Sequence, residues 1–173
     1  MAVNFAYENL IKSTSGEDLL LFHSGWSVLS TFRICPFKIE GKTYRTVEQY
    51  FQSQRALFAG RDDLYADIMG EYAPSKYGEI MASVQDKPEW EPVSIKVMET
   101  ALRAKFSQNK NVAKFLLSTG NSRIVFATPY DYFWGNGLLV HEPACNDPSK
   151  YPGSNMLGEL LGKVREEIKS GGS

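Results

Sequence analysis

The hydrophobic pattern of this sequence changes its period at Thr46. Before that residue, residues 37–44 alternate apolar and polar side chains around Gly41, as a β-hairpin does. After it, the spacing is helical, with one apolar face made by Val47, Tyr50, Phe51, Leu57 and Phe58. Thr46-Val47-Glu48-Gln49 has the form of a capping box, in which Thr46 is the N-cap and Gln49 reaches back to it. The pattern therefore predicts a hairpin followed by a helix that ends near Gly60.

The other elements follow from similar signals. We expect strands at 19–23 and 123–127, and helices at 62–71, 75–83, 92–106 with Pro92 at its first position, 110–118 and 156–169 with Asn155 as N-cap. Helices outnumber strands and do not alternate with them as repeated βαβ units. The predicted fold class is α+β, a predominantly helical single domain over residues 1–169 with a small β-sheet or hairpin. Residues 170–173, Ser-Gly-Gly-Ser, are expected to form a flexible tail.

Composition limits the classes of partner. The chain has 173 residues, of which 43% are hydrophobic, enough for one core. Its formal net charge is −1, with no long run of like charge, which argues against tight nonspecific binding to nucleic acid. The apolar runs are too short for a membrane span and no export signal is apparent, so we expect a cytoplasmic protein with Cys35 and Cys145 as reduced thiols.

Most standard catalytic signatures are absent from the sequence. There is no Walker-type phosphate loop, no Gly-x-Gly-x-x-Gly after a strand and no pair of histidines at metal-ligand spacing. His141 and Cys145 are near each other, but alone they leave a zinc site short of ligands. We therefore expect neither a metal nor a cofactor, and look to carboxylates, aromatic rings and amides for the chemistry.

The first predicted helix carries a polar stripe beside its apolar face. At 100° per residue, Glu48, Gln52 and Arg55 fall within one narrow sector. Such a stripe either lines a cleft or faces solvent, and the dipole at the start of the helix favours Glu48 in both cases. If the stripe lines a site, Glu48 stays ionised there and acts as a base for water or as an electrostatic partner of a cation.

Two further segments offer groups for a ligand. In residues 131–137, Trp134 presents a flat indole, Gly135 permits unusual backbone angles, and Asp131 is able to bind hydroxyls or act on a leaving nitrogen. The structural alternative is that Trp134 anchors the core and Asp131 forms a turn. Residues 153–158 open the last helix, where backbone N–H groups suit phosphate, although many such helix starts bind nothing.

Together these segments resemble the NADAR (YbiA-like) family from Phe22 to Ile168. The matching stretches, in order, are Leu29-Ser30-Thr31-Phe32 with Pro36-Phe37, Gly41 and Tyr44, Thr46 to Gln52, Ala73-Pro74, Trp90, Met98, Ala101-Leu102 with Lys105-Phe106, Thr119-Gly120, Asp131 to Gly135 with Gly137, and Gly153 to Gly158 with Arg165. Each stretch is short, and the assignment comes from their order and spacing.

The resemblance implies a hydrolase of N-glycosidic bonds. Members of the family act on ribosylamino-pyrimidine phosphates of the riboflavin pathway, and others remove ADP-ribose from modified guanine. By position, Glu48 would be the main catalytic carboxylate and Asp131 the second. Trp134 and Trp90 would hold the base or ribose, with Gln52, Arg55, Gly135 and Asn155 as further substrate-binding residues, Arg55 or the Asn155 helix start being nearest the phosphate.

Three positions depart from the family pattern. Thr31 stands where an Asn is usual, Arg55 where a Lys is usual, and Phe126 where a Glu often follows the Val. Arg55 keeps the positive charge and is able to bind phosphate through bidentate hydrogen bonds, which indicates an altered substrate geometry. Phe126 removes a carboxylate, so that position has no acid–base role here.

Three hypotheses about function remain open at this stage. The first is the N-glycosidase acting on a small ribosyl phosphate or ADP-ribosyl substrate. The second is a non-catalytic module that binds NAD or ADP-ribose, which predicts thermal stabilisation by ligand without release of base. The third is an enzyme that strips ADP-ribose from guanine in nucleic acid, which requires a basic approach surface. The sequence does not identify the base, the sugar-phosphate part or the oligomeric state.

Overall fold

A computed structural model describes residues 5–171 of the chain. Those residues divide between two compact units. Unit 1 takes its residues from Met1–Ser30 and Lys110–Ser173, and unit 2 is Thr31–Asn109. The described residues form six α-helices and two small sheets, which confirms the predicted α+β class.

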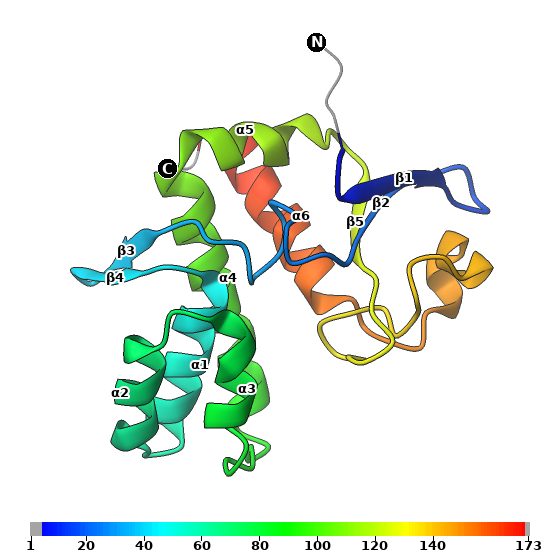
Figure 1. Ribbon diagram of the computed structural model, residues 1–173. Helices are drawn as coiled ribbons and strands as arrows, with labels where there is room; N and C mark the ends of the chain where they lie inside the picture. The colour runs from blue at the N-terminus through cyan, green and yellow to red at the C-terminus, as the bar shows by residue number, and fades with distance from the viewer. Residues whose placement is uncertain (1–4, 172–173) are drawn as a thin grey trace. The chain divides into compact units, whose positions relative to one another are not determined.

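Unit 1 is built on a three-stranded sheet in the order β1-β2-β5 (Figure 1). β1 (Glu8–Lys12) runs antiparallel to β2 (Asp18–Phe22), and β2 runs parallel to β5 (Arg123–Phe126). The central strand has four consecutive apolar residues, from Leu19 to Phe22, none more than 1% exposed. A strand covered on both faces needs such a continuous apolar run. The predicted strands β2 and β5 are confirmed, whereas β1 was missed because its exposed edge carries a weak pattern.

The remaining elements of unit 1 are helices and 3₁₀ turns. They are α5 (Lys110–Ser118), the 3₁₀ turns η2 (Pro143–Asn146) and η3 (Pro148–Lys150), and α6 (Met156–Lys169). Both α-helices have the predicted bounds. α6 packs directly on β5, since a Cβ added at Gly158 would lie 2.1 Å from the carbonyl oxygen of Ile124. Only glycine permits that approach.

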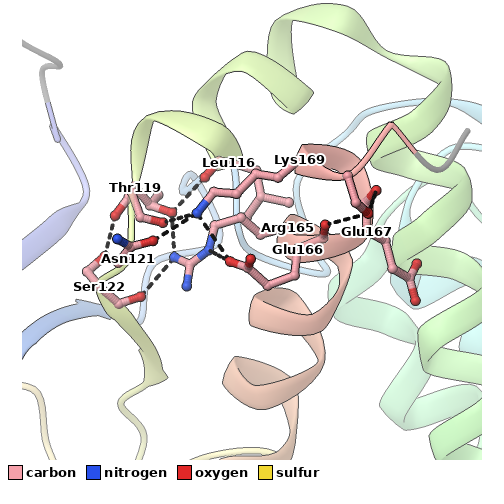
Figure 2. A network of polar contacts seen from close by, with 10 residues as sticks. Leu116, Thr119, Asn121, Ser122, Arg165, Glu166, Glu167 and Lys169 are labelled. Atoms are coloured by element: carbon pink, nitrogen blue, oxygen red, sulfur yellow. Dashed lines mark hydrogen bonds and ion pairs between the residues drawn. The ribbon is translucent and has the colours of Figure 1, made fainter.

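Arg165 on α6 joins this helix to the turn between α5 and β5 (Figure 2). Its Nη1 donates to Thr119 Oγ1 and to the Ser122 carbonyl, both at 2.8 Å, and the residue is only 6% exposed. Its Nε lies 3.6 Å from Glu166 Oε1, too far for a hydrogen bond, so this buried N–H has no hydrogen-bond partner among the described residues. Burial lowers the pKa of the guanidinium. The turn that starts β5 therefore depends on one buried cation.

Lys169 adds a second cation to the same turn. Its Nζ donates to the Gly120 carbonyl at 2.9 Å and to Asn121 Oδ1 at 3.0 Å. Positive groups favour the end of a helix such as α5, where the carbonyl groups lack partners within the helix. The two cations thus stabilise the point where α5 ends and β5 begins.

We expect Arg165→Met to lower the free energy of unfolding by about 1–3 kcal/mol, because it leaves buried acceptors without a donor. Urea denaturation of the mutant and the wild type measures this difference. Lys169→Met, at an exposed position of the same turn, is the matched control and should change stability less. Equal denaturation midpoints for Arg165→Met and wild type would contradict this account.

Unit 2 contains a hairpin and four helical segments (Figure 1). β3 (Phe37–Ile39) pairs antiparallel with β4 (Lys42–Tyr44), followed by α1 (Val47–Phe58), α2 (Asp62–Gly70), η1 (Pro74–Lys76) with α3 (Tyr77–Ile80), and α4 (Trp90–Gln108). Glu40 and Gly41 both have positive φ, at 51° and 78°, as a two-residue type I′ turn requires. The hairpin predicted for residues 37–44 is confirmed.

α1 begins as predicted but its cap differs in one detail. Thr46 Oγ1 accepts a hydrogen bond from Gln49 N at 3.0 Å, as expected of the N-cap. The Gln49 side chain, however, accepts from Arg45 N at 2.8 Å instead of from Thr46 N, so the capping box extends one residue further back. Leu57 and Phe58, placed by periodicity on the buried face, are 42% and 44% exposed, because they occupy the helix's last turn, which ends at the surface.

Two other cap predictions were also wrong in detail. Pro92 is the third residue of α4 and not the first, since the helix begins two residues earlier at Trp90; a proline is still accepted there because the first turn needs no N–H donor. Asn155 precedes α6 as predicted, but it adopts φ 50° and its side chain does not cap the helix. The Asn155 side chain does not cap α6 because both of its amide atoms are hydrogen-bonded to the backbone of β5.

Unit 2 buries a lysine. Lys105 on α4 is 1% exposed, and its ammonium lies over the Phe106 ring, 5.0 Å from the centroid. Burial lowers the pKa of this amine to about 7, an effect that Cys35 opposes and Arg33 reinforces. Cys35, in the same unit, and Cys145, in unit 1, are both free and buried, as the sequence suggested. Burial raises the pKa of both thiols.

The depressed pKa of Lys105 predicts a pH-dependent stability. Between pH 7 and the ordinary lysine pKa of about 10.4, the unfolded chain binds a proton that the folded chain does not, so folding becomes more favourable as pH rises. Lys105→Met removes this dependence. In urea denaturation, the free energy of unfolding of wild type should therefore rise relative to that of Lys105→Met as pH rises from 7 to 9.5. A difference that stays constant over that range would show that the amine is charged in the folded protein.

No helix within residues 5–171 combines the length and apolar character needed to cross a membrane. At the C-terminus, Ser170 still belongs to the end of α6, with its backbone N–H bonded to the Glu166 carbonyl at 3.1 Å. The last two residues of the predicted tail, Gly172 and Ser173, lie outside the described residues.

Candidate active site

The eight site residues predicted from the sequence fall into two sets. Unit 2 holds Glu48, Gln52, Arg55 and Trp90, and unit 1 holds Asp131, Trp134, Gly135 and Asn155. Within each set, the residues are connected by hydrogen bonds, by ring contacts or through one pocket wall.

Glu48 is the centre of the first set. It lies in the first turn of α1 and is half-buried. Its Oε2 accepts from Thr31 Oγ1 at 3.0 Å, and its Oε1 accepts from Gln52 Nε2 at 2.9 Å. The backbone N–H of Glu48 also donates to the Thr31 carbonyl at 3.0 Å. Hydrogen bonds to both oxygens, together with the start of the helix, stabilise the ionised form of a carboxylate.

The polar stripe predicted on α1 is a connected chain of hydrogen bonds. Arg55 Nη1 donates to Gln52 Oε1 at 3.3 Å, one turn from the contact between Gln52 and Glu48. Because a guanidinium only donates, it turns the Gln52 amide oxygen toward itself and leaves the amide N–H for Glu48. Arg55 is held in turn by Asp86, through Nε and Oδ1 at 2.7 Å. The orientation of the Glu48 carboxylate thus depends on residues two turns away.

Trp90 lies at the end of this chain, in the wall of a small pocket. The pocket has a volume of about 100 Å³ and is lined by Arg55, Phe58, Ala59, Gln85, Asp86, Lys87 and Trp90. Trp90 is only 5% exposed, and its ring contacts Phe51 and Phe58 at centroid distances of 5.6 and 5.2 Å. An indole packed in this way has little free face for a base.

Asp131 organises the loop that follows β5. Its Oδ1 accepts from the backbone N–H groups of Phe133 and Trp134, at 2.9 and 2.8 Å. This is the turn-forming role weighed for it from the sequence. Among the described residues, Oδ2 makes no hydrogen bond or ion pair, so one carboxylate oxygen is available to a ligand. The Trp134 ring meets the Phe133 ring edge to face, 4.8 Å between centroids.

The loop of residues 131–135 is tied to the start of α6. The backbone N–H groups of Ser154, Asn155, Met156 and Leu157 donate to the carbonyls of Tyr132, Gly135, Phe133 and Trp134, respectively, at 2.8–3.1 Å. These four N–H groups therefore serve the loop, and none of them is left for the phosphate that the sequence placed here. Position 135 requires a glycine, because a Cβ added there would lie 2.3 Å from Thr128 Cγ2 and 2.8 Å from the Asp131 carbonyl oxygen.

Asn155 fixes the other side of the same junction. Its Oδ1 accepts from Phe126 N and its Nδ2 donates to the Ile124 carbonyl, both at 2.9 Å, and the residue is 2% exposed. With both amide atoms used on β5, Asn155 positions the loop. Phe126, the departure from the family pattern, stacks on Phe22 with 5.2 Å between centroids, so this position has become apolar packing.

Sequence reasoning missed several residues that contact the first set or line its pocket. Thr31 was singled out only as a departure from a pattern, although that position in a matched stretch was a signal for its contact with Glu48. Gln85, Asp86 and Lys87 lie between two predicted helices and gave no signal. As for metals, no three His, Cys, Asp or Glu side chains within residues 5–171 gather in an arrangement that would hold an ion.

Comparison with known proteins places these features in a family. The model of the NADAR domain matches residues 21–169. The N-glycosidase YbiA of Escherichia coli is 34% identical over 142 residues, which cover 80% of this chain and 79% of YbiA. The solved NMR structure of E. coli YbiA has a TM-score of 0.73 at 30% sequence identity, covering 93% of this chain and 88% of that one.

Two further relatives extend the range of organisms. Protein irg-1 of Caenorhabditis elegans is 37% identical over 125 residues, 70% of this chain and 59% of that protein. The chloroplastic riboflavin biosynthesis protein PYRR of Zea mays is 31% identical over 170 residues, 87% of this chain but only a quarter of PYRR, at 25%. From the span of the family match, which takes in both sets of predicted site residues, the chain belongs to the NADAR family.

Proposed function

We propose that this protein is an N-glycosidase that hydrolyses the bond between a ribose phosphate and a nitrogen base. It is an enzyme of the hydrolase class, like the relatives named as N-glycosidases. The observation that carries the proposal is Glu48, a carboxylate with a hydrogen-bond donor on each oxygen at the start of α1. A carboxylate kept ionised in this way suits a reaction that passes through a cationic sugar.

The mechanism follows from the charge that develops on the sugar. As the C–N bond lengthens, positive charge builds on the ribose, and the ionised Glu48 stabilises it. Glu48 also orients a water and takes its proton while the water oxygen bonds to the anomeric carbon. The departing nitrogen leaves with the bond's electron pair and takes a proton from solvent, and Glu48 releases the water's proton to solvent, so the products are the free base and a ribose phosphate.

Asp131 is the second carboxylate of the proposal. Its Oδ1 is used by the backbone of its own loop, so the chemistry falls to Oδ2, either as a ligand of the ribose hydroxyls or as an aid to the departing nitrogen. Trp134, in the same loop, supplies the flat surface for the base. Gly135 and Asn155 contribute by keeping this loop on α6 and β5.

A ribosylamino-pyrimidine phosphate is the substrate class that we favour. The relation to a plant protein named for riboflavin biosynthesis supports it, since that pathway works on such compounds. ADP-ribosylated guanine is the alternative substrate, since it also has an N-glycosidic bond between a ribose and a base. The net charge of −1 gives weaker support to a nucleic-acid substrate, which would require a basic surface. We propose a cytoplasmic location, with which the free thiols of Cys35 and Cys145 agree.

Glu48→Gln should lower turnover by roughly 10²–10⁴-fold, because it removes the charge and the base while keeping the size of the side chain. Base release is measured by chromatography after incubation with a ribosylamino-pyrimidine phosphate, NAD, ADP-ribose or an ADP-ribosylated guanine oligonucleotide. Glu79→Gln, a carboxylate at an exposed position of α3 in the same unit, is the matched control and should keep wild-type activity.

The two outcomes separate catalysis from binding alone. Release of base by wild type and Glu79→Gln but not by folded Glu48→Gln supports the proposal and selects the substrate. If wild type releases no base from any of the four compounds while NAD or ADP-ribose raises its melting temperature, the chain is a binding module. A folded Glu48→Gln protein that is as active as wild type would move the catalytic role away from α1.

Thr31→Val should lower kcat by about 10-fold or more, because Glu48 loses a hydrogen bond made by its charged form. The valine keeps the shape of threonine, so an unchanged melting temperature separates this effect from misfolding. Thr31→Ser and Thr31→Asn each keep a donor and should retain most of the activity. Equal kcat values for the valine and serine variants would show that the hydroxyl has no part in positioning Glu48.

A further inference from the structure

The pocket in unit 2 has a chemistry of its own. Two cations, Arg55 and Lys87, and one anion, Asp86, are among its lining residues, so the charged side chains carry a net positive charge. Asp86 is already engaged with Arg55 at 2.7 Å. The Lys87 ammonium makes no hydrogen bond or ion pair with any residue in 5–171. A cationic group with no ionic partner in the wall of a concave site favours an anionic ligand.

The other walls argue against a base in this pocket. Trp90 is packed against Phe51 and Phe58, so a planar ring would have to displace one of them to stack on the indole. The pocket volume is about 100 Å³, smaller than a cavity of roughly 150 Å³ that holds one benzene. A group of phosphate size fits this space better than a substituted pyrimidine or purine.

The position of Arg55 on α1 relates the pocket to Glu48. The two residues are seven apart, which is two helical turns or about 10.5 Å along the axis. The hydrogen bonds through Gln52 connect them on one side of the helix. α4 also begins at the pocket, with Trp90 as its first residue, and the positive end of its dipole adds to the attraction for an anion.

We propose that this pocket binds the phosphate on the 5′ carbon of the substrate's ribose, and that Lys87 is the residue that recognises it. Arg55 forms the second cationic wall, and Asp86 keeps its guanidinium in place. The start of α6 is not needed for this task, since four of its N–H groups already serve the loop. This inference rests on the proposed function for the identity of the ligand, but the binding itself does not require turnover.

Binding of ribose 5-phosphate tests the inference without catalysis. By titration calorimetry, ribose 5-phosphate should bind wild type, and ribose should not bind it measurably. Lys87→Ala should lower the affinity for ribose 5-phosphate by about 10-fold or more, the loss expected for one charge-assisted hydrogen bond. Lys87→Arg should retain most of the affinity. Lys96→Ala, which removes an exposed lysine from α4 outside the pocket, is the matched control and should bind as wild type does.

Each outcome decides one question. Equal binding of ribose 5-phosphate by Lys87→Ala and Lys96→Ala overturns the inference, whether or not the enzyme releases base. A loss confined to Lys87→Ala supports it even if Glu48 proves dispensable and the proposed function fails. ADP-ribose is titrated in parallel. A loss of the same size for both ligands means that the pocket accepts a phosphate within a pyrophosphate, and a loss for ribose 5-phosphate alone means that it requires a terminal phosphate.

Discussion

Buried polar groups must find hydrogen-bond partners, and this requirement determines how the loop after β5 is held. The first backbone N–H groups around the start of α6 have no partners within the helix, so they take the carbonyls of Tyr132 to Gly135. Asn155 closes the arrangement by spending both amide atoms on β5. The start of α6, which the sequence suggested as a phosphate-binding site, thus connects the loop of residues 131–135 to the helix. These hydrogen bonds set where Asp131 and Trp134 lie.

The same reasoning explains why α1 suits a catalytic carboxylate. Thr31 and Gln52 each donate to Glu48, and Arg55 imposes the direction of the Gln52 amide. Because Arg55 fixes the Gln52 amide, this donor does not have to reorganise as charge develops on a substrate. The substitution of Thr31 for the more usual asparagine preserves a donor, which is the property that the position requires.

The fold could be predicted from the sequence where hydrophobic period and turn chemistry agree. The hairpin, the bounds of α5 and α6, and the buried central strand β2 all follow from local patterns. β1 could not be predicted, because an edge strand with an exposed Leu10 has little alternation. The helical period placed Leu57 and Phe58 on the buried face of α1, but both are exposed. Periodicity predicts which face of a helix is apolar, and it does not predict where the neighbouring elements end.

The contacts among the residues predicted on α1 could be anticipated from the sequence for a related reason. The stripe of Glu48, Gln52 and Arg55 is visible in helical spacing, and its members prove to be hydrogen-bonded to one another. Asp86 and Lys87 come from a segment without period, and only tertiary packing brings Asp86 to Arg55, 31 residues away in sequence. The family resemblance suggested Trp90 as a ring for the base, and the structure adds that Phe51 and Phe58 pack against this ring. The packed rings leave little open aromatic face in this pocket, and two of its lining residues, Arg55 and Lys87, are cations, so it favours an anion over a base.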